Sequence, residues 1–502
     1  MKSRLDSMLG RVTMYRLMVY SLALLVVLAL IFGVTGALAF APTAMLASLA
    51  VLLIVTYLTN RLFAGMFRVT PHSESSIITA LLLFFILQPT TDPTTLLQIA
   101  LAALFASASK YLLAFRGRHI FNPAAIGAVW LGIFHFFLAL WWVGNPILVG
   151  FTAVLALVVL YRTRRTELGT VFVVLAAIIM LSRNLMDGST FTEALKYVFT
   201  QTPLVFFAGF MLSEPLTLPP LRWQQLSVAA LVAVLFAIPI TTGTFQFGPE
   251  SALIVGNAAA FLFGQRSGIE LMMIGKRSLT PSSMEFAFRP THPLRYRAGQ
   301  YVELTLPHRG MDSRGARRSF SIVSAPREAD VVKIGIKTAA EKGSSFKKAL
   351  KAMDVGDTVH ATGVAGDFQL PKNPEKPLLL VAGGIGVTPF VSQLAELDRN
   401  HTRDIVVVYL SSDPAEAAYL KSLERSRGRV IVVSKTDVPD LPGSFENVIV
   451  PSLGQEELRA IVPDISRRDV YVSGPPGLVN SVSASARALK AKRLTKDYFS
   501  GY

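Results

Sequence analysis

The pattern of apolar and polar positions changes near the middle of the chain. Residues 17–263 contain almost all of the long apolar runs, whereas residues 270–502 alternate charged and apolar positions as water-soluble domains do. The first part therefore predicts a polytopic α-helical membrane domain, and the second predicts a soluble part built from strands and helices. At 502 residues the chain is long enough for two or three domains.

The apolar part predicts about ten membrane spans. Several runs are shorter than the roughly 20 residues of a perpendicular span, which predicts short helices packed inside protein. The first run extends to about residue 41 without a cleavage site, so we interpret it as a retained helix. The runs lie near residues 17–40, 43–58, 76–88, 96–115, 123–141, 146–161, 168–181, 202–213, 226–240 and 251–263.

Basic residues predict how these spans are oriented. With the N-terminus inside, the inner loops hold most of the lysines and arginines, and the outer loops hold chiefly Arg183 and Lys196. We therefore expect a multi-pass protein of the inner (cytoplasmic) membrane with both termini in the cytoplasm. Trp141, Trp142 and Trp223 are expected at the boundaries of the lipid bilayer, where aromatic side chains gather.

Composition excludes several chemistries. The chain has no cysteine, so disulfides and cysteine-ligated iron–sulfur clusters are excluded within it. The net charge of +16 suggests nucleic acid, but the basic residues cluster beside apolar segments without a binding motif, so no nucleic-acid partner is expected. Stacked haems need paired histidines across the bilayer, and only His135 lies well inside a span, with His72 and His119 in or beside inner loops. We interpret His135 as a core residue and predict no metal site.

Two stretches of the apolar part carry polar residues in a distinctive order. Residues 117–125 read Gly-Arg-His-Ile-Phe-Asn-Pro-Ala-Ala, in which Asn122 and Pro123 suit the start of a helix. Residues 206–217 read Phe-Phe-Ala-Gly-Phe-Met-Leu-Ser-Glu-Pro-Leu-Thr and end a short helix on a carboxylate and a proline. Both stretches, within roughly residues 60–265, resemble the membrane flavin subunit shared by the sodium-translocating NADH:quinone oxidoreductase and the Rnf complexes.

This resemblance implies a second flavin, FMN, in the membrane domain. The family commonly esterifies FMN to a threonine in an outer motif of the form Asp-Gly-x-Ser-Gly-Ala-Thr. Here the loop has Glu193 at the acceptor position, and Thr192 beside it is the alternative attachment point. We favour a cap formed by residues 187–192 on a helix that begins near Glu193, and therefore expect no covalent FMN. Lys110 and Glu214 are ionisable groups of this part, and neither alone indicates ion transport.

The soluble part begins with a predicted antiparallel β-barrel over residues 269–371. Its strands are expected at 271–274, 284–288, 300–306 and 320–323. The run Arg318-Ser319-Phe320-Ser321 offers a cation for a pyrophosphate, an aromatic face for a flavin and a hydroxyl near its reactive nitrogen. The run Gly343-Ser344-Ser345 opens a helix, whose N-terminus favours an anion.

A predicted α/β domain follows over residues 374–502. The buried strand 378–382 leads into Gly383-Gly384-Ile385-Gly386-Val387-Thr388-Pro389 and an amphipathic helix, which together predict a dinucleotide phosphate site. Further strands are expected at 405–410, 430–433 and 470–472, and the last ends at Ser473-Gly474-Pro475 before another helix.

Residues 270–502 resemble the ferredoxin–NADP reductase superfamily, specifically the NADH-oxidising subunit of the same sodium pump. The resemblance implies that Arg318, Phe320 and Ser321 hold FAD, with residues 343–345 at its pyrophosphate. It also implies that the two glycine turns flank the nicotinamide nucleotide and that Ser473 stands where the family places a cysteine. Tyr502 is the candidate for the terminal aromatic residue that covers the flavin.

These patterns predict an FAD-dependent NAD(P)H oxidoreductase that passes electrons to a quinone, a membrane flavin or an outer-side carrier. The alternative is a reductase that serves a soluble partner and uses the membrane domain as an anchor only. Ion pumping has only family analogy behind it. Residues 411–413 lack an arginine for a 2′-phosphate and favour NADH, whereas Lys435 could meet that phosphate and would favour NADPH.

Overall fold

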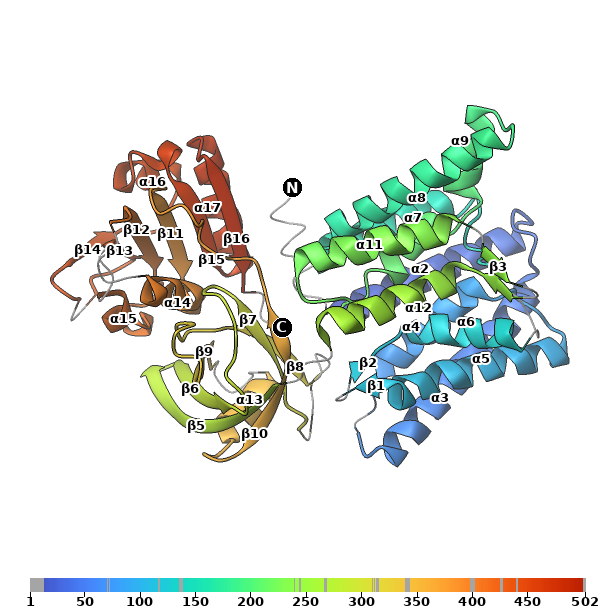
Figure 1. The fold of residues 1–502 in the computed structure, drawn as a ribbon, viewed down its shortest axis with the longest axis horizontal. Helices are drawn as coiled ribbons and strands as arrows, with labels where there is room; N and C mark the ends of the chain where they lie inside the picture. The colour runs from blue at the N-terminus through green and yellow to red at the C-terminus, as the bar shows by residue number, and fades with distance from the viewer. Residues whose placement is uncertain are drawn as a thin grey trace. The chain divides into compact units, whose positions relative to one another are not determined.

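The chain forms two compact units in the computed structural model, one within residues 12–266 and one within residues 267–502 (Figure 1). The first is almost entirely helical, and the second combines two sheets with helices. The structure describes residues 13–69, 71, 73–115, 118–134, 139–238, 240–242, 245–265, 269–308, 310, 312, 316–338, 344–397, 402–424, 428–438 and 441–499. His72 and His135 lie outside these residues, as do Gly343 and Tyr502.

Among the residues that the structure describes, four helices of the helical unit are long and apolar enough to cross a membrane. They are α2 (Met14–Val34), α3 (Pro42–Met66), α5 (Pro93–Leu112) and α8 (Thr166–Met186). Shorter apolar helices occupy most of the other predicted runs, namely α4 (Ser73–Ile86), α6 (Pro123–Ile133), α7 (Val149–Thr163), α11 (Arg222–Ala237) and α12 (Pro249–Ala260). The short helices expected from the sequence are therefore present, whereas ten complete spans stay a prediction.

The remaining segments of this unit are short. The run at 202–213 forms α10 (Leu204–Phe206) and a π-helical turn, Phe207–Met211. Two hairpins pair β1 (Ala114–Phe115) with β2 (Arg118–His119) and β3 (Ile240–Thr242) with β4 (Phe245–Phe247). The helix α9 (Phe191–Thr200) begins after the capping residue Thr190, whose side chain accepts the Glu193 amide while the Glu193 carboxylate accepts the Thr190 amide. The predicted cap is confirmed.

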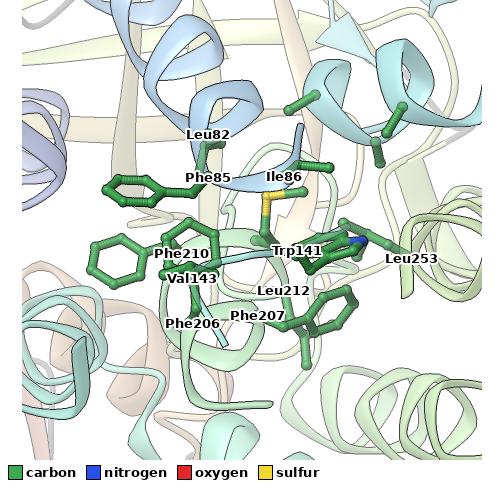
Figure 2. Packing of buried hydrophobic residues seen from close by; sticks show 14 of the residues in the cluster. Leu82, Phe85, Ile86, Trp141, Val143, Phe206, Phe207, Phe210, Leu212 and Leu253 are labelled. Carbon is green, nitrogen blue, oxygen red and sulfur yellow. The ribbon is translucent and has the colours of Figure 1, made fainter. Parts of the chain in front are cut away.

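Aromatic side chains fill the core of the helical unit. Phe206 lies with its ring centre 5.6 Å from that of Phe85 and 5.1 Å from that of Phe210 (Figure 2). Trp141 lies among them, 4% exposed, and Trp142 is 5% exposed. The prediction that these two tryptophans anchor the chain in the membrane interface is therefore wrong, because both indole rings are packed inside protein; their depth in the bilayer stays a prediction. Trp223 is 59% exposed, as a boundary position requires.

A six-stranded antiparallel sheet opens the second unit. Its strands are β5 (Ile269–Thr280), β6 (Ser283–Pro290), β7 (Tyr301–Thr305), β8 (Arg317–Ser321), β9 (Val332–Lys337) and β10 (Thr358–Ala365), in the order β8-β7-β10-β5-β6-β9. The helix α13 (Ser345–Ala352) covers apolar side chains of this sheet with Phe346 and Leu350. All four strands expected here are present, and β9 and β10 complete the sheet.

The second sheet is parallel and six-stranded. Its strands are β11 (Leu378–Gly383), β12 (Ile405–Leu410), β13 (Arg429–Ser434), β14 (Phe445–Ile449), β15 (Asp469–Gly474) and β16 (Arg493–Tyr498), in the order β14-β13-β12-β11-β15-β16. Its longer helices are α14 (Thr388–Glu396) and α17 (Pro476–Ala488). Because the strand order reverses between β11 and its neighbours β12 and β15, a ligand is expected at the carboxyl ends of β11 and β15.

Candidate functional site

The side chain of Arg318, the cation predicted to bind the pyrophosphate of FAD, reaches the start of a helix. Arg318 is 4% exposed on β8, and its Nη2 donates to Asp312 Oδ1 at 3.1 Å and to Ser344 Oγ at 3.4 Å. Its guanidinium carbon lies 5.5 Å from the centre of the Phe346 ring, on the first turn of α13. Strand β8 and helix α13 are far apart along the chain, so the sheet topology is what brings these residues together.

The same helix start offers backbone donors. The Ser345 amide donates to Asp312 Oδ2 at 3.1 Å, and the Ser345 hydroxyl accepts the Asp312 amide at 2.9 Å. His308 Nε2 lies 2.9 Å from that hydroxyl. The Asp312 carboxylate is thus held by a guanidinium and a helix N-terminal amide, which are the donors that a pyrophosphate needs. The residues present fit a phosphate-bearing cofactor.

The other residues of the β8 motif differ in how far their side chains are exposed. Ser321 is 8% exposed and lies opposite Tyr301 of β7, whereas Ser319 is exposed and Phe320 is half-buried. The Phe320 ring centre lies 5.8 Å from that of Phe346. Phe320 therefore leaves part of an aromatic surface accessible beside the anion-binding donors.

Two glycine turns meet at the carboxyl ends of β11 and β15. A Cβ on Gly386 would lie 2.6 Å from Gly474 Cα and 2.7 Å from the Ser473 carbonyl oxygen, so any side chain at Gly386 would collide with backbone. Gly384 and Gly474 adopt φ of 53° and 148°. Such turns leave backbone amides open to a close ligand.

Flanking residues fix these turns in place. The Thr388 hydroxyl donates to the Ile385 carbonyl at 3.0 Å at the start of α14, where Pro389 occupies the first turn. Pro475 precedes α17. The structure therefore brings together the predicted residues of 383–389 and 473–475, as the sequence pattern indicated.

Ser473 has an acidic neighbour that the sequence reasoning missed. Ser473 is fully buried and pairs with Asp497 of β16, and its hydroxyl has no hydrogen-bond partner among the described residues. Burial, together with the negative charge of Asp367, raises the pKa of Asp497 to about 6. The Phe499 amide donates to the Gly474 carbonyl at 2.9 Å, which places a second missed residue beside the glycine turn. The run Asp-Tyr-Phe shortly before the predicted flavin-covering residue Tyr502 was the available signal.

Buried hydrogen bonds fasten the barrel to the α/β domain. The Ser392 hydroxyl donates to the Ser324 carbonyl at 2.7 Å, and Gln393 Nε2 donates to the Phe368 carbonyl at 2.6 Å. A third link is Glu416, whose carboxylate accepts the Thr280 hydroxyl at 2.8 Å. These links span both domains, so the anion-binding donors and the glycine turns belong to one compact unit.

In the helical unit, the two stretches singled out from the sequence lie against each other. Arg118 Nη2 donates to the Pro215 carbonyl at 2.9 Å. The Glu214 carboxylate lies between His119 Nε2 and Asn122 Nδ2, each 2.9 Å away. His119 and Asn122 are 8% and 1% exposed. We refer to Arg118, His119, Asn122 and Glu214 as the polar cluster.

Other polar groups of the helical unit are also held inside it. The Asn122 amide donates to Asn257 Oδ1 at 2.8 Å, which ties α12 to the polar cluster. Lys110 Nζ donates to the Ser75 carbonyl at 3.0 Å. Glu250, which sequence reasoning missed, is 9% exposed and accepts Trp141 Nε1 at 2.8 Å.

Comparisons with known proteins identify one part of the chain. Residues 270–370 match the family model described as an oxidoreductase FAD-binding domain, which confirms the predicted FAD-binding oxidoreductase module. The chain is 27% identical over 213 residues to the reductase subunit of an aromatic O-demethylase from an Amycolatopsis species, over 40% of this chain and 59% of that protein. It is 26% identical over 253 residues to the electron transfer component of toluate 1,2-dioxygenase from Pseudomonas putida, over 49% and 71%.

Two solved structures resemble the chain over nearly half its length. The FAD/NAD-binding domain of nitric oxide dioxygenase from Vibrio cholerae has 21% identity and a TM-score of 0.40 over 47% of this chain and 99% of that one. The reductase of an Amycolatopsis cytochrome P450 has 22% identity and a TM-score of 0.39 over 46% and 70%. The chain spans 59% of the length of the first two curated relatives. The resemblance of the helical unit to a membrane flavin subunit stays a prediction.

Proposed function

We propose that this chain is a membrane-bound, FAD-dependent NAD(P)H oxidoreductase that delivers electrons to an acceptor reached through its helical unit. The proposal rests on one observation: the anion-binding donors, Arg318 and the Ser345 amide, belong to the same compact unit as the two glycine turns. The match of residues 270–370 to an oxidoreductase FAD-binding domain supports the flavin. The curated relatives are reductase components, which supports the reaction class.

Each residue of the site has a role in this proposal. Arg318 and the Ser345 amide would hold the FAD pyrophosphate, with Phe320 and Ser321 beside the flavin ring. The turns at Gly384 and Gly474 would admit the phosphates of the nucleotide. When bound, FAD accepts a hydride from the reduced nicotinamide and releases the two electrons singly.

The carboxyl end of β15 would orient the nicotinamide. The buried Ser473 hydroxyl can donate a hydrogen bond to a carboxamide, the role that a thiol would fill less well because it is the weaker donor. Asp497, which pairs with Ser473 across the two strands, has a pKa raised by burial to about 6 and therefore holds a proton below about pH 6. Phe499 and Tyr502 are the aromatic candidates for excluding water from the flavin.

Polar groups near β12 and β13 favour NADH over NADPH. The Ser411 hydroxyl donates to the Asp413 carbonyl and the Ser434 hydroxyl donates to the Thr436 carbonyl, each at 2.6 Å. Both hydroxyls are therefore engaged with backbone, and the Asp413 carboxylate would repel a 2′-phosphate. Lys435, which is exposed, is the residue that would instead support NADPH.

We propose that electrons leave through the helical unit to a quinone, a non-covalent FMN or an outer-side carrier. The polar cluster supports this, because buried ionisable groups in an apolar unit are costly and are most often functional. Glu193 serves in the cap of α9, which argues against an ester link in that loop. The unit would lie in the inner membrane with about ten spans and both termini cytoplasmic.

The second candidate function is a reductase that serves a soluble partner, with the helical unit as an anchor only. The names of the relatives favour it, since they are components of multi-part oxygenase systems. The chain has no cysteine for an iron–sulfur cluster of its own, so such a partner would have to accept electrons from the flavin site directly.

One experiment separates the two functions. The full-length protein in lipid is assayed with NADH and two acceptors, ferricyanide for the FAD site and a short-chain quinone for the membrane path. We expect Glu214→Gln to lower quinone reduction at least about tenfold, the effect of losing one charge-assisted hydrogen bond, while ferricyanide reduction is retained. Glu193→Gln is the matched control, because glutamine also completes a capping box. If the wild-type protein reduces no quinone, quinone is excluded as the acceptor. If Glu214→Gln reduces quinone normally, the polar cluster does not serve the electron path, and the anchor function is favoured.

A further inference from the structure

A cavity in the helical unit collects arginines from different helices. It has a volume of about 290 Å³ and lies where α7 ends and where α8 and α11 begin. Its charged lining residues are Arg164, Arg165, Arg222 and Glu167. Three cations against one carboxylate leave the cavity with a net positive charge of two.

Backbone geometry adds to this charge. Arg164 ends α7 in the left-handed conformation, with φ of 60°, and Arg165 is the residue before α8, so one sharp turn supplies two of the arginines. Arg222 is the first residue of α11 and forms an ion pair with Glu167 in the first turn of α8. The starts of two helices therefore lie at the same cavity, and each contributes a partial positive charge of roughly half a unit, one of which is offset by the C-terminal end of α7.

We propose that this cavity binds a phosphate group, carried either by an anionic phospholipid or by a small soluble molecule. The guanidinium group of an arginine can donate two parallel hydrogen bonds to two oxygens of one phosphate. Gln225 and Thr166 add neutral hydrogen-bonding groups to the lining of the cavity. The volume approaches that of ordinary small-ligand pockets and exceeds what a bare phosphate fills. No residue of the polar cluster lines this cavity, and the proposal does not depend on the reductase function.

The surroundings favour a lipid as the source of the phosphate. Tyr161, Leu168 and Leu226 give the cavity apolar walls that suit the glycerol and upper acyl region of a lipid. Trp223 follows Arg222, is 59% exposed and lies edge-on to Phe263 with ring centres 6.1 Å apart. An exposed tryptophan beside arginines at the ends of apolar helices is typical of headgroup depth in a bilayer.

The chain offers a control against a simpler explanation. Basic residues at helix ends also orient membrane proteins, and such an effect depends on the charge of the loop and not on a cavity. Arg162 belongs to the same basic run as Arg164 and Arg165 but does not line the cavity. Arg162→Gln therefore removes the same charge from the same turn as Arg165→Gln and leaves the cavity intact.

The test uses the full-length protein and two probes. Retention of added phosphatidylglycerol is measured by native mass spectrometry after delipidation. Protection by inorganic phosphate is measured by thermal unfolding in phosphatidylcholine nanodiscs. The midpoint of thermal unfolding without added phosphate reports that each variant is folded. We expect Arg165→Gln and Arg222→Gln to weaken one probe at least about tenfold, the effect of losing a charge-assisted hydrogen bond, while Arg162→Gln matches the wild type.

Every outcome decides the proposal. Loss of phosphatidylglycerol retention identifies a lipid site, and loss of phosphate protection alone identifies a site for a soluble phosphate. Arg222→Lys keeps the positive charge but lacks the planar guanidinium group, so we expect its binding to be intermediate between that of the wild type and that of Arg222→Gln. If Arg162→Gln weakens binding as much as Arg165→Gln, or no variant differs from the wild type with either probe, there is no phosphate site in this cavity.

Discussion

Replacing Arg318 by glutamine should weaken FAD binding without unfolding the barrel. Arg318 is 4% exposed and donates through Nη2 toward the start of α13, where the Ser345 amide points at the same acceptor carboxylate. In the FAD complex these donors would face the pyrophosphate. Glutamine keeps a neutral donor and loses the positive charge, so the cost is one charge-assisted hydrogen bond.

A charge-assisted hydrogen bond contributes about 1.5–3 kcal/mol, which corresponds to about 10- to 150-fold in the dissociation constant. Flavin fluorescence, titrated against apoprotein prepared by mild chaotrope treatment, measures that constant directly. Arg318→Lys retains the charge without the planar fork and should fall between the wild type and Arg318→Gln.

Arg317 provides the matched control for this experiment. It precedes Arg318 on β8, so its side chain leaves the sheet on the opposite face. We expect Arg317→Gln to bind FAD as the wild type does. The assignment of the pyrophosphate to this end of β8 would be refuted if Arg318→Gln bound FAD normally, or if Arg317→Gln lost affinity to the same extent.

Three further predictions concern the second unit. Gly386→Ala would place a Cβ 2.6 Å from Gly474 Cα, so we expect the KM for NADH to rise at least about tenfold while FAD content stays normal. Burial raises the pKa of Asp497 to about 6, so the folded state keeps a proton that the unfolded state releases at a lower pH. The free energy of unfolding, measured in urea, should therefore fall as the pH rises from about 4 to 6 and stay constant above that. Asp497→Asn should remove this fall. Glu416→Ala leaves the hydroxyls of Thr280 and Ser282 without their acceptor and should lower the unfolding free energy by about 1–3 kcal/mol, whereas the exposed Glu424→Ala should change it little.

Local patterns predicted the parts of the site that are made from neighbouring residues. The run from 378 to 389 contains its own strand, turn and helix, so its phosphate-binding geometry follows from residues within a dozen positions of one another. The β8 motif is likewise local, and its four residues lie on one strand, which begins three positions before the strand expected at 320–323. The helix start at Ser345 was predicted from the Gly-Ser-Ser run that precedes the helix.

Residues that depend on distant contacts were missed or misplaced. Asp497 becomes part of the site only because β16 pairs with β15, and its own sequence context is that of an ordinary strand end. Trp141 has the sequence context of a membrane boundary, but Glu250, 109 positions later, accepts its indole N–H inside the core. Hydropathy cannot distinguish these two environments, because both follow an apolar run.

The polar cluster shows how such a distant contact bears on function. His119 and Glu214 are 95 positions apart, and the sequence marked both stretches without indicating that they meet. Removing water from a carboxylate costs several kcal/mol, and well-packed apolar residues of similar volume are often equally or more stable than a buried ion pair. An anchor has no need of such a pair, so under the anchor function replacing His119 and Glu214 together by leucine should leave electron transfer unchanged. It should cost only the hydrogen bond that Asn122 Nδ2 loses, about 1–3 kcal/mol of stability. Under the electron-path function the same double variant should fold and still lose quinone reduction, because the groups serve the acceptor and not the packing.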